Sequence, residues 1–214
     1  MATVAGVRKP RILIADDHRI VAEGLRALLE PEFELVQIVE DGRQLLEAHD
    51  QLRPDVVVAD VTMPQLNGIQ AIRKLREARS RAKFIMLTMH PDVDYATSAL
   101  DAGASGDVLK HSAPDELVTA IREALAGRVY ITPRIAGQVF EALRRGEKQT
   151  RLTTRQAEVL QLVAEGRSAK EIAATLNLSP RTVESHKYAI MEQLGLKTTA
   201  ELIQYAVKSG LVQS

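Results

Sequence analysis

Short apolar runs alternate with segments of helical periodicity through the first 126 residues of the chain. Five runs predict strands, several of them apolar on both faces as strands packed between helices require, over residues 11–15, 33–39, 56–60, 84–88 and 106–110. Five intervening segments place apolar side chains at helical spacing and predict helices, over residues 19–30, 42–51, 68–79, 92–102 and 114–126. This alternation predicts an α/β domain with a doubly wound, five-stranded parallel sheet.

The rest of the chain has no strand pattern. Residues 127–150 open with Gly127, carry Pro133 and end in a polar tail, which predicts a linker with one helix over 134–145. Beyond it the pattern predicts four helices, over residues 154–165, 169–176, 180–194 and 199–209. We therefore expect an α/β domain over 1–126, a partly helical linker over 127–150 and an all-α four-helix domain over 151–214.

Composition and charge narrow what these segments can do. The chain has no cysteine, which excludes disulfides, cysteine-ligated zinc and thiol catalysis. Residues 1–126 hold 15 Lys and Arg against 20 Asp and Glu, whereas residues 127–214 hold 13 against 8, which favours a polyanion as the partner of the second part. Because no apolar run approaches membrane-spanning length and the N-terminus lacks a signal-like segment, we expect a cytoplasmic protein with no membrane contact.

Polar side chains gather where the predicted strands end. Asp16 and Asp17 follow the first strand and Asp60 ends the third, while Thr88 and Lys110 end the fourth and fifth. Parallel strands present their carboxyl ends at one edge of a sheet, so these side chains should converge there. Converging carboxylates repel one another unless a cation neutralises them, and Mg²⁺ prefers oxygen ligands. Helix capping by Asp16 and Asp17 is the simpler alternative, but it leaves the convergence of Asp60 and Lys110 unexplained.

The acidic edge predicts phosphoryl chemistry. A carboxylate beside Mg²⁺ can attack a phosphoryl group and form an aspartyl phosphate. Asp60 stands alone at its strand end and is the best candidate for that nucleophile. The five histidines show no ligand spacing, so we assign none of them to the metal.

Residues 169–194 have the length and the break of a helix-turn-helix. The candidates for DNA phosphate contacts are Lys170, Arg181, Lys187 and Lys197. Thr182, Glu184, Ser185 and Tyr188 complete the candidate DNA-binding set, the last three as base-reading residues. An ordinary helical bundle with a solvated polar face is the alternative.

Two blocks of sequence carry a family resemblance. With Asp16-Asp17, the stretch DVTMPQLNG from Asp60 to Gly68, Thr88 and Lys110, residues 10–126 resemble the receiver domain of two-component response regulators, which is flavodoxin-like. The stretch LTTRQAEVLQLVAEGRSAKEIAATLNLSPRTVESHKYAIMEQLGLKTTAEL resembles the LuxR-type helix-turn-helix. The whole chain is therefore similar to the NarL/FixJ family of response regulators.

This resemblance implies a role for each matched residue. Asp60 accepts a phosphoryl group from a histidine kinase, Lys110 contacts the acyl phosphate and Thr88 moves to bond a phosphoryl oxygen. Asp17, Asp60 and the backbone carbonyl of Thr62 bind Mg²⁺, and Asp16 acts mainly through metal-bound water. The helix over 180–194 enters the major groove of double-stranded DNA and the helix over 199–209 supports a homodimer, with RNA polymerase as a further candidate partner.

One residue departs from the family pattern. Receivers usually place Tyr or Phe three residues before the strand-end lysine, where this chain has Asp107. Either signalling takes another route, or the two states are weakly separated, or the residue has drifted at a surface position. A Mg²⁺-dependent phosphohydrolase is a second hypothesis, disfavoured because Thr62 occupies the place of its acid/base carboxylate. A DNA-binding or protein-interaction module that ignores phosphorylation is the third.

Overall fold

A computed structural model describes residues 8–89, 91, 93–145, 152–209 and 211–212. Its parallel sheet runs in the order β2-β1-β3-β4-β5-β6. The strands are β1 (Arg11–Ala15), β2 (Glu34–Val39), β3 (Val56–Asp60), β4 (Lys83–Thr88), β5 (Gly106–Leu109) and β6 (Tyr130–Ile131). The doubly wound α/β fold is confirmed, and the predicted strands are displaced by a residue at most at either end.

Helices cover both faces of the sheet because the central strands are apolar on both sides. Ile12 and Ile14 of β1 pack with α1 (Arg19–Leu29) and α5 (Ala113–Leu125). Leu13 and Ala15, which alternate with them, pack with α2 (Gly42–Leu52), α3 (Gly68–Glu77) and α4 (Val93–Ala102). A short 3₁₀ helix, η1 (Lys110–Ser112), joins β5 to α5.

The prediction of five strands is wrong, because the sheet has six. β6 pairs in parallel with β5, and the Tyr130 and Thr132 amides donate to the Ser105 and Asp107 carbonyls at 3.1 and 3.0 Å. The following helix α6 (Pro133–Arg145) then packs on α4, with Ile135 and Val139 buried against Ala96. A two-residue strand needs only backbone pairing and leaves no apolar run to detect.

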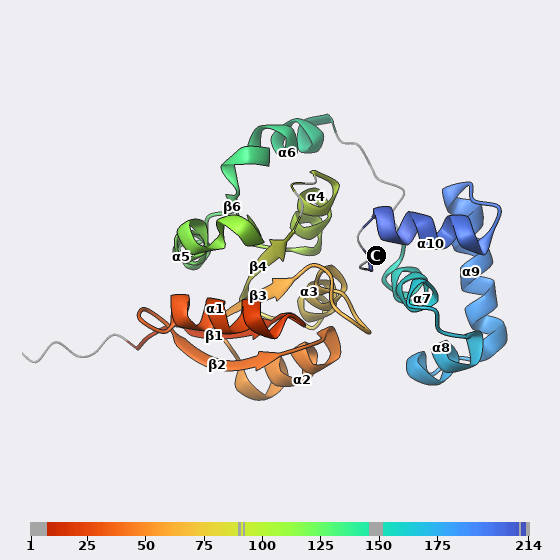
Figure 1. Ribbon diagram of the computed structural model, residues 1–214, viewed down its shortest axis with the longest axis horizontal. Helices are drawn as coiled ribbons and strands as arrows, with labels where there is room; N and C mark the ends of the chain where they lie inside the picture. Colours follow the sequence, from red (N-terminus) through yellow and green to blue (C-terminus); the bar gives the residue numbers. More distant parts are fainter. Residues whose placement is uncertain (1–7, 90, 92, 146–151, 210, 213–214) are drawn as a thin grey trace, which may run out of the picture.

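The remaining elements form a separate helical domain beside the sheet (Figure 1). Its helices are α7 (Thr154–Ala164), α8 (Ala169–Leu176), α9 (Pro180–Leu194) and α10 (Thr199–Lys208), so the four-helix prediction is confirmed. Ser168 and Ser179 cap α8 and α9 through the Glu171 and Thr182 amides, while Gly195 ends α9 at φ +68°. Within the described residues, none of the helices combines the length and apolar character that a membrane crossing requires.

Gly68 opens α3 at a point where the backbone of β3 comes very close. A Cβ atom placed on Gly68 would lie 2.1 Å from the Asp60 carbonyl oxygen and 2.7 Å from Met86 Cε. The Asp60 carbonyl belongs to the backbone of β3 and cannot move without disturbing the sheet. We therefore expect Gly68→Ala to lower the free energy of unfolding by roughly 1–3 kcal/mol. Urea denaturation of both proteins measures this loss.

Gly24 supplies the matched control, since it lies inside α1 with nothing within 4 Å of its virtual Cβ. Gly24→Ala should raise the free energy of unfolding by roughly 0.5–1 kcal/mol, because alanine favours helix. Equal stability changes in the two variants would contradict the close approach at Gly68.

Candidate functional site

An acidic pocket lies at the carboxyl edge of the sheet. Asp60 ends β3, Asp16 and Asp17 follow β1, and Lys110 follows β5. The Lys110 ammonium lies 2.8 Å from Asp16 Oδ2 and 2.8 Å from Asp60 Oδ2. The Asp16 and Asp60 side chains are buried, whereas Asp17 is one-quarter exposed, at 25% of its side-chain area. The sequence therefore predicted this convergence correctly, with Lys110 bridging two strands.

Charge is unbalanced in this pocket, because three carboxylates face one ammonium group. Burial raises the pKa of Asp60 to about 6, although the charge of Lys110 acts in the opposite direction. Burial by itself would lower the pKa of Lys110, but the carboxylates of Asp60 and Asp16 outweigh it, so that this pKa is raised. Asp16 Oδ2 and Asp17 Oδ1 are buried, and their partners are the ionic contacts with Lys110 and His18. Oxygen donors with lone pairs to spare suit a hard divalent cation.

His18 belongs to the same cluster. Its Nδ1 atom lies 3.0 Å from Asp17 Oδ1 and 3.3 Å from Asp16 Oδ1. One potential ligand atom from each of Asp16, Asp17, His18 and Asp60 falls within 4.8 Å of the others. Spacing along the chain gave no reason to select this histidine; its position directly after the aspartate pair was the signal available.

The remaining predicted receiver residues lie beside Asp60. Thr88 is buried at the end of β4, in register with Leu109 and thus next to Lys110. The Thr62 amide donates to Asp60 Oδ1 at 3.3 Å. Residues 61–67, which we call the acceptor loop, connect Asp60 to α3 and bring Thr62 to the pocket.

Asp107 is not at a surface position, so the explanation by surface drift is wrong. Its side chain is fully buried on β5, where β6 covers the strand edge, and neither carboxylate oxygen has a hydrogen-bond partner. Burial raises the pKa of Asp107 to about 7. Among the described residues, no polar group compensates its charge.

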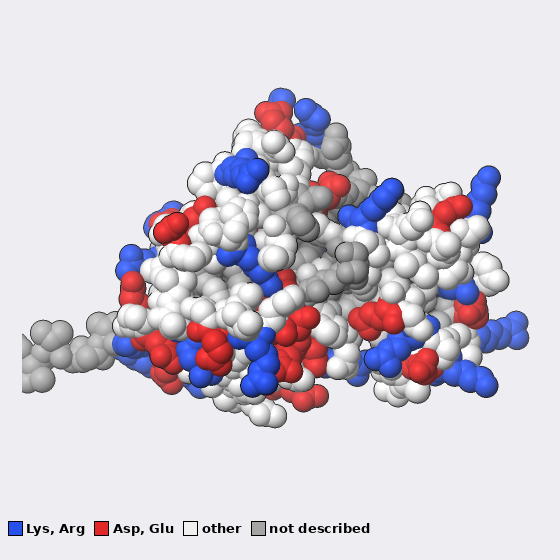
Figure 2. Space-filling model, in the orientation of Figure 1, with Lys and Arg blue, Asp and Glu red and all other residues white. Residues whose placement is uncertain are grey.

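The candidate DNA-binding residues lie on the outer side of the helical domain. Figure 2 shows Lys and Arg side chains along its edge, over α8 and α9, on the side away from the sheet. Arg181, Ser185 and Tyr188 are exposed on one stripe of α9, and Tyr188 is 64% exposed. Lys170 on α8 and Lys197 after α9 are also exposed.

Several candidates on α9 make contacts within the domain. Glu184 forms an ion pair with Lys187, with 2.7 Å between Glu184 Oε2 and Lys187 Nζ, and the pair neutralises part of the charge on each side chain. The Thr182 hydroxyl lies 2.8 Å from that of Ser179, so it takes part in the cap of α9. Arg181, Ser185 and Tyr188 are therefore the more accessible candidates of this helix.

Comparison with known proteins identifies both domains. Residues 12–122 match the response regulator receiver domain, and residues 150–206 match the bacterial regulatory proteins of the luxR family. The chain is a response regulator of the receiver–LuxR family. Its second half is a LuxR-type DNA-binding domain, and its relatives are transcriptional regulators.

Several relatives match this regulator over nearly their whole length. The transcriptional regulatory protein MctR of Rhizobium johnstonii is 38% identical over 210 residues, covering 95% of this chain and 96% of MctR. DegU of Brevibacillus brevis is 33% identical, covering 96% of both chains. RcsB of Salmonella enterica serovar Typhimurium, solved bound to a promoter with the phosphomimetic BeF₃⁻, is 30% identical with a TM-score of 0.69. That match covers 94% of this chain and 100% of RcsB.

Proposed function

We propose that a histidine kinase phosphorylates this regulator on Asp60 and that the phosphorylated form binds double-stranded DNA as a homodimer. The observation that supports this most directly is the buried Asp60 carboxylate, held 2.8 Å from Lys110 beside two further aspartates. In this assignment residues 1–126 are the receiver unit, 127–150 the linker and 151–214 the DNA-binding unit.

Transfer to Asp60 needs an ionised carboxylate with a free lone pair, and it needs charge compensation. A carboxylate oxygen of Asp60 attacks the phosphorus, a P–O bond forms, and the P–N bond to the kinase histidine breaks with its electrons leaving on the imidazole. Lys110 offsets charge on the acyl phosphate, and Thr88 is placed to donate to a phosphoryl oxygen.

Mg²⁺ fits the oxygen donors of the pocket. Asp17, Asp60 and the Thr62 carbonyl would hold it directly, and Asp16 through water. The bound cation would offset negative charge as donor and acceptor meet. Because the acceptor loop has Thr62 where a phosphohydrolase needs a second carboxylate, we propose that the protein is a phosphoryl acceptor rather than a turnover enzyme.

The DNA contacts come from α8, α9 and the turn after α9. α9 would enter the major groove, with Arg181, Lys170, Lys187 and Lys197 against phosphates and with Glu184, Ser185 and Tyr188 toward bases. The Thr182 side chain is held at the N-terminus of α9 by its cap contact with Ser179. In this proposal the protein acts in the cytoplasm, where it binds DNA. RNA polymerase is a further proposed partner.

Asp60→Asn is expected to abolish phosphorylation. With Mg²⁺ and a small-molecule phosphodonor, the intact mass of the parent protein should rise by one phosphoryl group, because the carboxylate is the acceptor. The side-chain amide of the variant is a far poorer nucleophile than a carboxylate, so the variant should show no gain. Asp115→Asn is the matched control, since Asp115 is exposed in the first turn of α5 and should leave the gain unchanged. An equal gain in Asp60→Asn would refute the assignment.

A further inference from the structure

A cavity of about 520 Å³ lies at the amino edge of the sheet, at the end opposite to the acidic pocket. Its size falls within the roughly 300–1,000 Å³ that ligand sites occupy. We call it the amino-edge groove. The described side chains that line it include four cations against two carboxylates: Arg53, Arg79, Arg81 and Lys83 against Asp50 and Asp55. This lining is positive although residues 1–126 as a whole hold more acidic than basic residues.

Both carboxylates of the amino-edge groove have partners elsewhere. Asp50 Oδ1 lies 3.7 Å from Arg53 Nη2. Asp55 Oδ2 accepts from the Arg11 amide at 2.8 Å. Neither carboxylate therefore forms an ion pair with the remaining three cations.

Those three cations, Arg79, Arg81 and Lys83, belong to the short segment 79–83 that leads into β4. Within the part of the chain that the structure describes, their side chains have no ion pair and no hydrogen bond. Like charges that line one cavity repel one another, so a polyanion bound there gains from all three at once.

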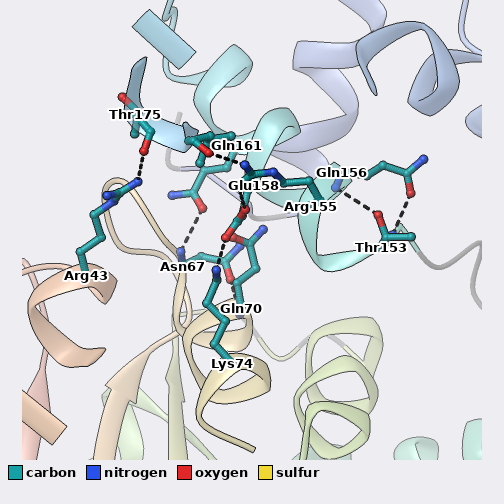
Figure 3. Close-up of polar contacts among 11 residues, drawn as sticks. Arg43, Asn67, Gln70, Lys74, Thr153, Arg155, Gln156, Glu158, Gln161 and Thr175 are labelled. Atoms are coloured by element: carbon teal, nitrogen blue, oxygen red, sulfur yellow. Dashed lines mark hydrogen bonds and ion pairs between the residues drawn. The ribbon is translucent and has the colours of Figure 1, made fainter. Parts of the chain in front are cut away.

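Several polar groups between the receiver and the helical domain, by contrast, pair with one another (Figure 3). Lys74 of α3 lies 2.6 Å from Glu158 of α7. Gln161 Nε2 of α7 donates to the Met63 carbonyl at 2.8 Å, and Gln161 Oε1 accepts from the Asn67 amide at 2.9 Å. The chain supplies partners for these groups, whereas its described residues supply none for the three cations of the amino-edge groove.

The segment 79–83 is held in a defined conformation by its own contacts. Arg76 Nη1 of α3 donates to the Ser80 carbonyl at 3.1 Å, and the Lys83 amide donates to the Asp55 carbonyl at 2.9 Å. Arg79 has φ +59°, in the left-handed region that favours glycine. Because the backbone is already fixed, a ligand loses little affinity to ordering it.

A buried histidine lines the same groove and has a hydrogen-bonding atom to spare. His49 is 6% exposed, and burial lowers its pKa, so the ring is neutral near pH 7 and carries one N–H. The Ala82 amide donates to Ser80 Oγ at 3.2 Å, and the Ser80 hydroxyl in turn reaches His49 Nε2 at 2.8 Å, which leaves the ring hydrogen on Nδ1. Nδ1 is buried and has no partner among the described residues. A buried donor left without an acceptor costs about 1–3 kcal/mol, and an anionic oxygen would offset that cost.

We propose that the amino-edge groove binds an oligophosphate chain, either free or carried by a nucleoside. Arg79 and Arg81 bind phosphoryl oxygens through paired N–H donors, and Lys83 acts as a point charge. The three cations stand two residues apart along the segment, so a ligand with its charge spread along a chain meets more of them than a single phosphate does. The site lies away from Asp60 and does not depend on its phosphorylation.

Isothermal titration calorimetry of the full-length protein tests this site, with inorganic tripolyphosphate, ATP and adenosine as probes and without added Mg²⁺. Both anions should bind with a Kd below about 1 mM at low salt, and adenosine should not bind. ATP binding at least tenfold tighter than tripolyphosphate identifies the nucleotide as the ligand, and equal or weaker ATP binding identifies the free chain. Failure of both anions to bind, or adenosine binding as tight as that of ATP, would overturn the proposal.

Two variants of the groove keep the test decisive. Arg81→Gln and Arg79→Gly should each weaken tripolyphosphate binding roughly tenfold, because each removes a charge-assisted contact. Arg79→Gly also places glycine at a positive φ, which glycine adopts readily, so misfolding would not account for its loss of binding. Arg134→Gln is the matched control, at an exposed arginine of α6 outside the groove, and should bind as the parent does. Unchanged binding in both groove variants, or an equal loss in Arg134→Gln, would overturn the proposal.

Amide NMR separates the amino-edge groove from the basic surface of the helical domain. On addition of tripolyphosphate, the largest chemical-shift changes should fall on residues 79–83. If the largest changes fall on α8 and α9 instead, the anion binds the candidate DNA-binding surface and the groove is not its site.

Discussion

The free energy of unfolding of this regulator should fall as the pH rises from about 4 to about 7, and Asp107→Asn should remove most of that fall. The ordinary pKa of the carboxyl is 3.8, and burial raises it to about 7 in the folded protein. Well below pH 3.8 the carboxyl is protonated in both states and no penalty exists. As the pH rises, the unfolded chain releases its proton first and is favoured, until above pH 7 the buried group is also ionised. The full loss is about 4 kcal/mol, because each pKa unit corresponds to about 1.4 kcal/mol.

The measurement is urea denaturation at a series of pH values in an Asp60→Asn background. That background is needed because burial also raises the pKa of Asp60, to about 6, which produces a pH dependence of the same sign. Adding Asp107→Asn should flatten the curve, whereas adding Asp115→Asn, at an exposed carboxylate, should leave it unchanged. Parallel curves for the Asp107 variant and its background would show that this carboxylate is solvated or paired in solution.

DNA binding should weaken by roughly a factor of 10³–10⁴ between 50 and 200 mM salt, because each phosphate contact releases condensed counterions. In the proposed complex Lys170, Arg181, Lys187 and Lys197 would supply the cationic contacts of one chain, and a homodimer would double them. Fluorescence anisotropy with an operator fragment gives the slope of log K against log salt.

Single substitutions then show how much each cationic side chain contributes to that slope. Lys170→Gln should reduce the magnitude of the salt slope by about one for each bound copy of the chain, because each copy loses one phosphate contact. Lys187→Gln should change it less, because Glu184 already neutralises part of the Lys187 charge. Lys9→Gln, at the opposite end of the receiver, is the control. A slope near zero in the parent protein would contradict α8 and α9 as the DNA-binding surface.

The predictions from sequence succeeded where the signal was local or topological. Strand and helix limits agreed closely because apolar periodicity reports burial directly, and Asp60 and Lys110 could be brought together because parallel strands end at one edge. Burial of Asp107 could not be foreseen, since it depends on β6 and α6 folding back over β5 and α4. Gln161 gave no signal either, because its partners Asn67 and Met63 lie 94 and 98 residues away.

The acceptor loop contacts both Asp60 and α7, and thermodynamic linkage makes any coupling between the two sites mutual. If a phosphoryl group on Asp60 favours one arrangement of the two domains, then an operator that prefers the same arrangement must favour the phosphoryl group by an equal factor at equilibrium. In that case operator DNA is an allosteric effector of Asp60. The phosphorylated fraction in a cell would then reflect how many operators are vacant as well as how active the kinase is.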